Sequence, residues 1–163
     1  LISNNLMYGI DSASWGGQGR PFEFTGDFIN ARVTHNTVDA SGSRLMTAAG
    51  AAASGFVFND NIAPLNTYGI KGDGKASGTA TLEHYYPGYE LTNNVLAGND
   101  NGLYPSNNFH PATLNAVGFV DRGNRDYRLD DASPYKNAAT DGTDIGANID
   151  DLQQLRENFT RLR

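Results

Sequence analysis

One short phrase occurs four times along this chain and constrains the fold more than any other feature. Each copy is an apolar alternation, then an asparagine, then further apolar residues: "LISNNLM", "ARVTHNTVD", "GFVFNDNIAP" and "YELTNNVLAGND". The asparagines in register are Asn5, Asn36, Asn61 and Asn94, and the differences between these positions are 31, 25 and 33. Repeats of this length with variable loops are typical of solenoids, in which each unit buries its apolar face only by stacking on its neighbours.

The residues around each asparagine alternate as a β-strand does. Three positions earlier stand Ile2, Val33, Phe58 and Leu91, and apolar residues return directly after each asparagine. This period-2 alternation predicts strands with one buried face, and no helical period lies between the asparagines. The repeat therefore predicts an all-β fold, a parallel β-helix (β-solenoid) of about four coils. Stacked coils would place the asparagines above one another, and we expect their amides to form a hydrogen-bonded ladder.

A second register runs beside the first. Nine residues after the last three asparagines lie Leu45, Ile70 and Leu103, each in a short apolar segment. The first repeat departs from this rule, because its matching Phe22 comes seventeen residues after Asn5. The eight additional residues predict a loop insertion around "DSASWGGQGR".

Composition excludes several classes of protein. The 18 acidic and 12 basic residues give a net charge of −6, which argues against a nucleic-acid binder. No apolar run approaches the length of a membrane span. The chain has no cysteine, and so no disulfide, thiolate metal site or cysteine nucleophile, while its 19 glycines suit many turns. Its first residue is Leu, with no initiator Met or signal peptide, which predicts a processed chain or a piece of a longer one.

The end of the chain leaves the repeat. We expect coils over residues 1–118 and a capping tail over 119–163, within one domain. Three- and four-residue steps predict an amphipathic helix from about residue 150, with acidic residues at its N-terminal end, and we expect this helix to cover the last coil. The apolar residues of its stripe are Ile149, Leu152, Leu155, Phe159 and Leu162.

The coil phrases and the ending "DYRLDDASPYKNAATDGTDIGANID" together resemble the C-terminal portion of secreted bacterial proteins of the right-handed parallel β-helix class. The resemblance implies a secreted or cell-surface location and a right-handed coil. The class includes polysaccharide lyases and hydrolases, tailspikes and adhesins, so the resemblance indicates the fold more strongly than the function.

Lyases of this class use a basic residue beside a uronate carboxyl group, often with calcium held by acidic residues. The candidate bases here are Lys71, Arg44 and His35, without an acidic trio at matching positions. Hydrolases of the class use clustered aspartates, and the clustered aspartates of this chain all lie in its tail. Turn formation is the competing interpretation of those aspartates.

Oxygen-rich loops indicate calcium as a candidate cofactor, with Asp100, Asp141 and Asp144 as candidate ligands. Their spacing matches no defined calcium loop. Sugar binding would use exposed aromatic faces, for which Trp15, Tyr85 and Tyr86 are the candidates. The competing interpretation is that these aromatic residues pack loops onto the flank of the solenoid.

The predicted solenoid has a cap on its C-terminal side and none at its N-terminal side. An uncovered coil presents unpaired backbone groups, which upstream coils or another copy of the chain would cover. Two hypotheses follow. The first is an extracellular β-helix module with a structural, assembly or polysaccharide-binding role and no complete active site. The alternative is the C-terminal fragment of a polysaccharide lyase or glycoside hydrolase.

Overall fold

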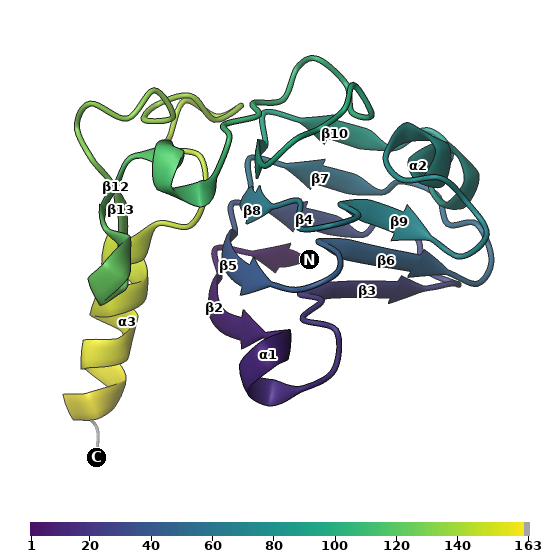
Figure 1. Ribbon diagram of the computed structural model, residues 1–163. Coiled ribbons are helices and arrows are strands. Elements are labelled where there is room, and N and C mark those ends of the chain that lie inside the picture. Colours follow the sequence, from purple (N-terminus) through teal and green to yellow (C-terminus); the bar gives the residue numbers. More distant parts are fainter. Residues whose placement is uncertain (162–163) are drawn as a thin grey trace.

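The chain is mostly β, with parallel strands in stacked sheets and a short C-terminal helix, as the computed structural model in Figure 1 shows. The structure describes residues 1–161, so Leu162 of the expected apolar stripe lies outside the described residues. No helix in the described part is both long enough and apolar enough to cross a membrane.

Three parallel sheets hold the repeat, and the chain visits them in a fixed order. We call one passage through the sheets a round. Three rounds visit all three sheets, and a fourth visits the first two, an arrangement compatible with a β-helix. Sheet A contains β1 (Ile2–Ser3), β4 (Arg32–Thr34), β7 (Val57–Asn59) and β10 (Glu90–Thr92); sheet B contains β2 (Leu6–Asp11), β5 (Thr37–Ser41), β8 (Ile62–Pro64) and β11 (Val95–Ala97); sheet C contains β3 (Phe22–Thr25), β6 (Met46–Ala49) and β9 (Ile70–Gly72).

The register of sheet A follows the asparagine phrase. Ile2 pairs with Val33, Val33 with Phe58, and Phe58 with Leu91, so the apolar residue three before each asparagine stacks on its equivalents. In sheet C the second register is shifted by one residue, because Ile70 pairs with Met46 and not with Leu45. Leu103 follows a turn, in an irregular segment, and belongs to no strand.

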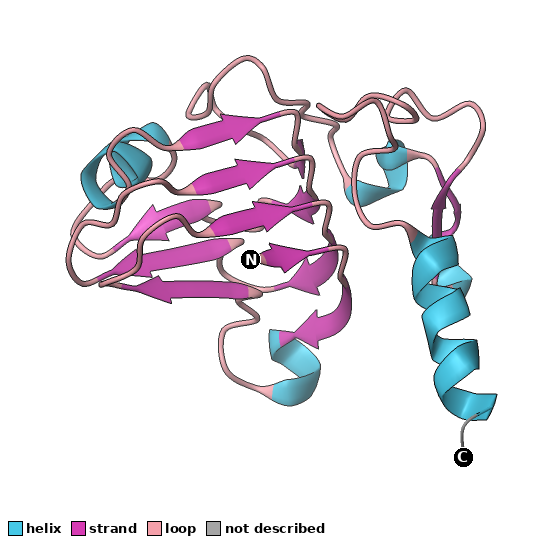
Figure 2. Ribbon diagram, turned by 180° about the vertical axis from the view of Figure 1, so that it is seen from behind, coloured by secondary structure: helices cyan, strands magenta, loops and turns pink. Residues whose placement is uncertain are grey.

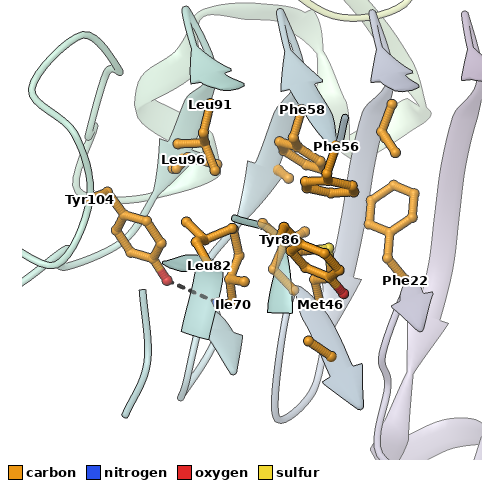
Figure 3. Packing of buried hydrophobic residues seen from close by; sticks show 14 of the residues in the cluster. Phe22, Met46, Phe56, Phe58, Ile70, Leu82, Tyr86, Leu91, Leu96 and Tyr104 are labelled. Atoms are coloured by element: carbon orange, nitrogen blue, oxygen red, sulfur yellow. Dashed lines mark hydrogen bonds between the residues drawn. The ribbon is translucent and has the colours of Figure 1, made fainter. Parts of the chain in front are cut away.

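The core lies inside the three sheets, and stacked aromatic rings run through it (Figure 3). The ring centroids of Phe56 and Tyr86 are 4.4 Å apart, and those of Phe22 and Phe58 are 5.8 Å apart in an edge-to-face arrangement. Each side chain is almost fully buried. Truncating such a buried ring costs about 3–5 kcal/mol, so these stacks contribute strongly to cohesion between rounds.

The expectation of an all-β chain is only partly correct, because the chain also contains helical segments. Short helices interrupt the rounds, and an antiparallel hairpin follows them. Loop insertions and the tail accommodate these elements because neither is held in the strand register. They are α1 (Ser12–Trp15), α2 (Thr79–Tyr85), the 3-10 turns η1 (Leu114–Val117) and η2 (Arg122–Asn124), the hairpin strands β12 (Phe119–Asp121) and β13 (Asp126–Leu129), and α3 (Ile149–Arg161).

The expected C-terminal helix is confirmed as α3, but it does not cover the last round. Its first turn lies near round 1, where the backbone N–H of Asn148 donates to Asn4 Oδ1 at 2.7 Å. Leu155 and Phe159 remain 54% and 71% exposed, so most of the apolar stripe is unburied. The tail runs back along the molecule before the helix begins, and the helix therefore points past β3 (Figures 1 and 2).

Candidate functional site

The four predicted asparagines lie in one line at the turn between sheets A and B. Asn5 Nδ2 donates to Asn36 Oδ1 at 2.9 Å, Asn36 Nδ2 to Asn61 Oδ1 at 2.9 Å, and Asn61 Nδ2 to Asn94 Oδ1 at 3.0 Å. A fifth member, Asn108, accepts from Asn94 Nδ2 at 2.9 Å. From Asn36 to Asn108 the side chains are buried, so each amide depends on its neighbours for hydrogen bonds.

This ladder has a direction. Each Oδ1 accepts both the backbone N–H and the Nδ2–H of the asparagine one round nearer the N-terminus, as Asn36 does from Asn5 at 3.1 and 2.9 Å. At the C-terminal end, Asn108 Nδ2 turns to the carbonyls of Leu91 and Pro105, both at 3.0 Å. At the other end, no donor within the described residues reaches Asn5 Oδ1.

A second column stands beside the ladder. The residue before each repeat asparagine has left-handed backbone, with φ of 52° at Asn4, 52° at His35, 58° at Asp60 and 52° at Asn93. Asn, Asp and His are the non-glycine residues that most readily adopt this conformation, which explains the "NN", "HN", "DN" and "NN" pairs. The second residue of each pair joins the ladder, and the first contacts the tail.

The tail segment 137–148, which we call the strap, crosses this column from round 4 to round 1. Asn93 Nδ2 donates to the Ala138 carbonyl at 2.9 Å, and Asp60 Oδ1 accepts the Thr140 N–H at 2.8 Å. His35 Nε2 lies 3.4 Å from Asp141 Oδ2, and the strap ends at the Asn148–Asn4 bond already described. The strap therefore ties four rounds together along one flank.

A hairpin clamp holds the tail to sheet B. Asp39 on β5 accepts from Arg122 Nε at 2.8 Å, from Arg122 Nη2 at 2.7 Å and from the Tyr127 hydroxyl at 2.7 Å. Burial acts to raise the pKa of Asp39, but hydrogen bonds from Arg122 and Tyr127, with the guanidinium charge, lower it below the ordinary value. The sequence carries no signal for this clamp, because its members come from a repeat strand and from the distant tail.

The round 4 end of the stack is covered in all three sheets. On β9 of sheet C, the Ile70 N–H donates to the Tyr104 hydroxyl and the Gly72 N–H to Thr81 Oγ1, both at 2.9 Å. On sheet B, the Leu96 N–H donates to the Phe109 carbonyl at 2.8 Å. On sheet A, the Leu91 carbonyl of β10 accepts from Asn108 Nδ2 at 3.0 Å. The cap therefore consists of α2 and residues 98–113, and not of the tail 119–163.

The round 1 end has no such cover. β1, β2 and β3 are the terminal strands of sheets A, B and C, and each pairs on one side only within the described chain. Ile2, Met7 and Phe24 are partly exposed, whereas the residues that pair with them in round 2, Val33, Val38 and Ala48, are fully buried. The apolar core therefore reaches the surface at this end.

Of the candidate bases, the structure brings Arg44 and Lys71 together on the sheet C side, with His35 in the turn between sheets A and B. Arg44 Nη1 donates to the Lys71 carbonyl at 3.3 Å, and Lys71 Nζ donates to the Lys75 carbonyl at 3.1 Å. Neither cation forms an ion pair with a described residue. Backbone carbonyls thus accept hydrogen bonds from both cationic side chains.

His35 lies in a cleft of about 980 Å³ between the strap and round 1. Its Nε2 lies 3.8 Å from the buried Asp60 carboxylate and 3.4 Å from Asp141. Hydrogen bonds from Thr143 lower the pKa of Asp141, and the nearby His35 adds to this effect. The Asp60 and Asp141 oxygens already accept hydrogen bonds from the strap, so this pair serves to seat the tail.

Trp15 stands at the end of α1 with 81% of its surface exposed. It borders a hollow of about 710 Å³ that Gln18, Arg20 and Glu23 also line. Asp11 caps α1 by accepting the Ala13 N–H at 2.9 Å, and Gly16 ends the helix with φ of 74°. The loop insertion predicted in round 1 is therefore the element that presents this ring.

Tyr85 and Tyr86 are core residues, which corrects their assignment as sugar contacts. Only 6% of Tyr85 and 2% of Tyr86 is exposed. Tyr86 stacks on Phe56, and the Tyr85 hydroxyl donates to the Asp73 carbonyl at 2.8 Å. The helix α2 turns both rings inward because residues 79–85 lie across the end of the stack, where apolar surface needs cover.

The calcium candidates do not form a cluster. Asp100 lies 3.8 Å from His110 in the cap, Asp141 accepts two hydrogen bonds from Thr143, and Asp144 accepts the Asn137 N–H at 2.9 Å. Across residues 1–161, no group of three or more His, Cys, Asp or Glu side chains is placed to hold a metal ion. Asp141 instead forms a turn, the competing interpretation given above for the tail aspartates, and Asp144 joins the two ends of a loop within the strap.

No family model, curated protein or solved structure matches this chain. The ladder, the strap and the two unlike ends are the features of the molecule that bear on its function.

Proposed function

We propose that this chain is an extracellular module of the right-handed parallel β-helix class with a structural role. It closes one end of a β-helical stack and receives a β-structured partner at the other end. The observation that carries this proposal is the asymmetry of the two ends: side chains and loops satisfy the edge of round 4, while β1, β2 and β3 all present unpaired edges within the described chain. An exposed, unblunted edge favours pairing with another strand.

Adding one round to the uncovered edge tests the proposal. A variant carries a second copy of residues 32–56 before Leu1, which places the copied Asn36 25 residues before Asn5, the native Asn36–Asn61 interval. Neighbouring repeats contribute interface free energy, so the melting temperature should rise and the amides of β1–β3 should exchange more slowly with deuterium. An unchanged melting temperature together with unchanged exchange would contradict the proposal.

Trp15 favours a second candidate function, the binding of a glycan. An exposed indole face beside Gln18, Arg20 and Glu23 offers one stacking surface and several polar groups for a sugar ring. Trp15 is the only tryptophan, so its fluorescence reports directly on ligands at this hollow. Binding of oligosaccharides should change its emission. Trp15→Ala should abolish retention of the protein on a polysaccharide that the unmodified chain binds.

Phe159→Ala is the matched control for this experiment, because Phe159 is also an exposed aromatic residue but lies on α3. Equal retention by the two variants would exclude Trp15 as a sugar contact.

The enzymatic alternative, a lyase or hydrolase fragment, makes a more specific prediction. It predicts activity on a polysaccharide that Lys71→Ala or Arg44→Ala abolishes, although neither cation has an acidic partner in the described chain.

A further inference from the structure

The direction of the asparagine ladder determines which kind of partner the round 1 end binds. We propose that this end binds a parallel strand–turn–strand segment whose turn carries an asparagine, and that this asparagine donates its backbone N–H and Nδ2–H to Asn5 Oδ1. The inference deepens the proposed function and depends on it. It specifies the chemistry and the orientation of the partner.

The ladder supplies the first step. At each of the four steps from Asn5 to Asn108, one Oδ1 accepts two donors from the preceding asparagine, with distances between 2.9 and 3.1 Å. Asn5 has already given its Nδ2 hydrogens to Asn36 Oδ1 and to the Ser3 carbonyl at 2.9 Å. What remains at the end of the ladder is an acceptor, and it needs a donor.

A second copy of this chain does not supply that donor. Two copies that meet by their first rounds bring one Asn5 Oδ1 against another, and two acceptors do not form a hydrogen bond. A copy stacked head to tail presents Asn108, which lies within the covered end and is only 7% exposed, so it does not reach Asn5 of another copy. The complementary partner is therefore a round with its own asparagine.

The turn conformation adds a second requirement. In rounds 1 to 4 a residue with left-handed backbone precedes the ladder asparagine, and this conformation points the asparagine into the stack. A matching partner carries Asn, Asp, His or Gly at that position. Its strands run parallel to β1, β2 and β3, because every pairing between rounds is parallel.

Two flanking elements extend past the uncovered edge. Both α1 and α3 project beyond β3 in the two opposite views (Figures 1 and 2). At 1.5 Å per residue, α3 spans about 20 Å, while rounds of a sheet are about 4.8 Å apart. Trp15 on α1 and Leu155 and Phe159 on α3 are exposed apolar residues on these projections. In both views α1 lies directly below the stack, so an added round would contact it, whereas α3 stands to one side.

The experiment compares three versions of the added-round variant, all with residues 32–56 copied before Leu1. The first keeps the copied Asn36, the second carries Asn36→Ala in the copied segment only, and the third carries Asn36→Asp there. The native ladder stays intact in all three. Deuterium exchange at the outward amides of β1 and β3 measures their pairing with the added round. Trp15 emission reports whether the added round covers α1.

With asparagine in the copy, exchange should slow by about tenfold or more, and Trp15 emission should shift to shorter wavelength. The alanine version should lose most of this protection, since the Nδ2–H donor to Asn5 Oδ1 is missing and only the backbone N–H remains. The aspartate version should lose all of it, because its carboxylate donates no hydrogen bond and places a negatively charged acceptor beside Asn5 Oδ1.

The outcomes separate the two proposals. Equal protection by all three versions would overturn the asparagine requirement while leaving the proposed stacking function intact. No protection in any version would overturn both. A defined dimer of the unmodified chain, detected by light scattering and accompanied by protection of β1–β3, would also overturn the inference, because a second copy would then satisfy the edge without a donor at Asn5.

Discussion

Thr140 donates its backbone N–H to Oδ1 of Asp60 at 2.8 Å, and its hydroxyl donates to Oδ2 of the same carboxylate. Asp60 is 2% exposed, so these two bonds replace water around a buried charge. The Asp60 carbonyl accepts the Gly146 N–H at 2.9 Å as well. One residue of round 3 therefore holds the strap at two points, although the strap lies far beyond it along the chain.

Thr140→Val should loosen the strap without unfolding the rounds. The substitution keeps the backbone N–H but removes the hydroxyl donor to a buried carboxylate, a loss of about 1–2 kcal/mol. Deuterium exchange should quicken across residues 137–148 and remain slow in β7 and β8. Thr143→Val is the control, because its hydroxyl bonds only to Asp141 within the same turn; equal loosening by both variants would argue against the Asp60 contact.

Substitution in the middle of the ladder should cost far more than substitution at its start. Asn61→Ala removes a buried amide that bonds to Val33 O, Asn59 O and two other asparagines, and should lower the free energy of unfolding by about 3–5 kcal/mol. Asn5→Ala removes the partly exposed end of the ladder, where the backbone N–H of residue 5 still donates to Asn36 Oδ1, and should cost about 1 kcal/mol. Urea titration measures both values, and similar losses would contradict a continuous ladder.

Asp39→Asn should weaken the hairpin clamp by about 2 kcal/mol at neutral pH, because charge-assisted bonds to Arg122 and Tyr127 are lost. The folded pKa of Asp39 lies below its ordinary value of 3.8, so its contribution is present above that pH and disappears as pH falls through the folded pKa. The difference in stability between wild type and variant should therefore shrink in acid. Asp131→Asn, at an exposed pair with Lys136, should show almost no difference.

Tyr104→Phe should destabilise the covered end. The Ile70 N–H loses its only described partner, which costs about 1–3 kcal/mol in a buried site. Burial raises the pKa of Tyr104 to about 12. Between pH 10 and 12 the unfolded state therefore releases this proton first, and wild-type stability falls with rising pH. The variant should lack this part of the alkaline loss, whereas Tyr68→Phe, at an exposed ring, should behave as wild type.

Glu23→Pro should prevent an added round from pairing. Phe22 donates its N–H to Leu45 O in round 2, and successive residues of a strand direct their N–H groups to opposite sides, so the Glu23 N–H faces the uncovered edge. Proline there removes a donor that the native rounds do not use. The gain in melting temperature from the copied residues 32–56 should vanish with Glu23→Pro and persist with Glu23→Ala; a persistent gain in both would place the added strand elsewhere.

The repeat could be predicted from the sequence because it is local. In every round the backbone bends in the same way, and the asparagine follows three residues after an apolar residue that points inward. The strand period and the position of the turn can therefore be read from the residues around Asn36 or Asn61 alone. Asn108 was missed because it follows Asn94 at a much shorter interval than the other ladder members, although "NNFH" after "NNVL" carried the same pair of asparagines.

Candidate site residues were harder to predict, because exposure depends on which loop folds over which edge. Tyr85 and Tyr86 lie beside a proline and a glycine and have the composition of a surface loop, yet α2 buries both rings. Trp15 shares that composition but stays exposed, because it lies at the end of α1, which projects past the round 1 edge. Residue type alone does not distinguish these two situations.

The sequence alone determined the parallel repeat, the line of asparagines and the terminal helix, because each depends on spacing within one short segment. Only the tertiary structure decided the path of the strap, the Asp39 clamp, the source of the cap and the direction of the ladder. Those features join segments that are distant along the chain, and their energies come from hydrogen bonds and burial that exist only when the rounds are stacked.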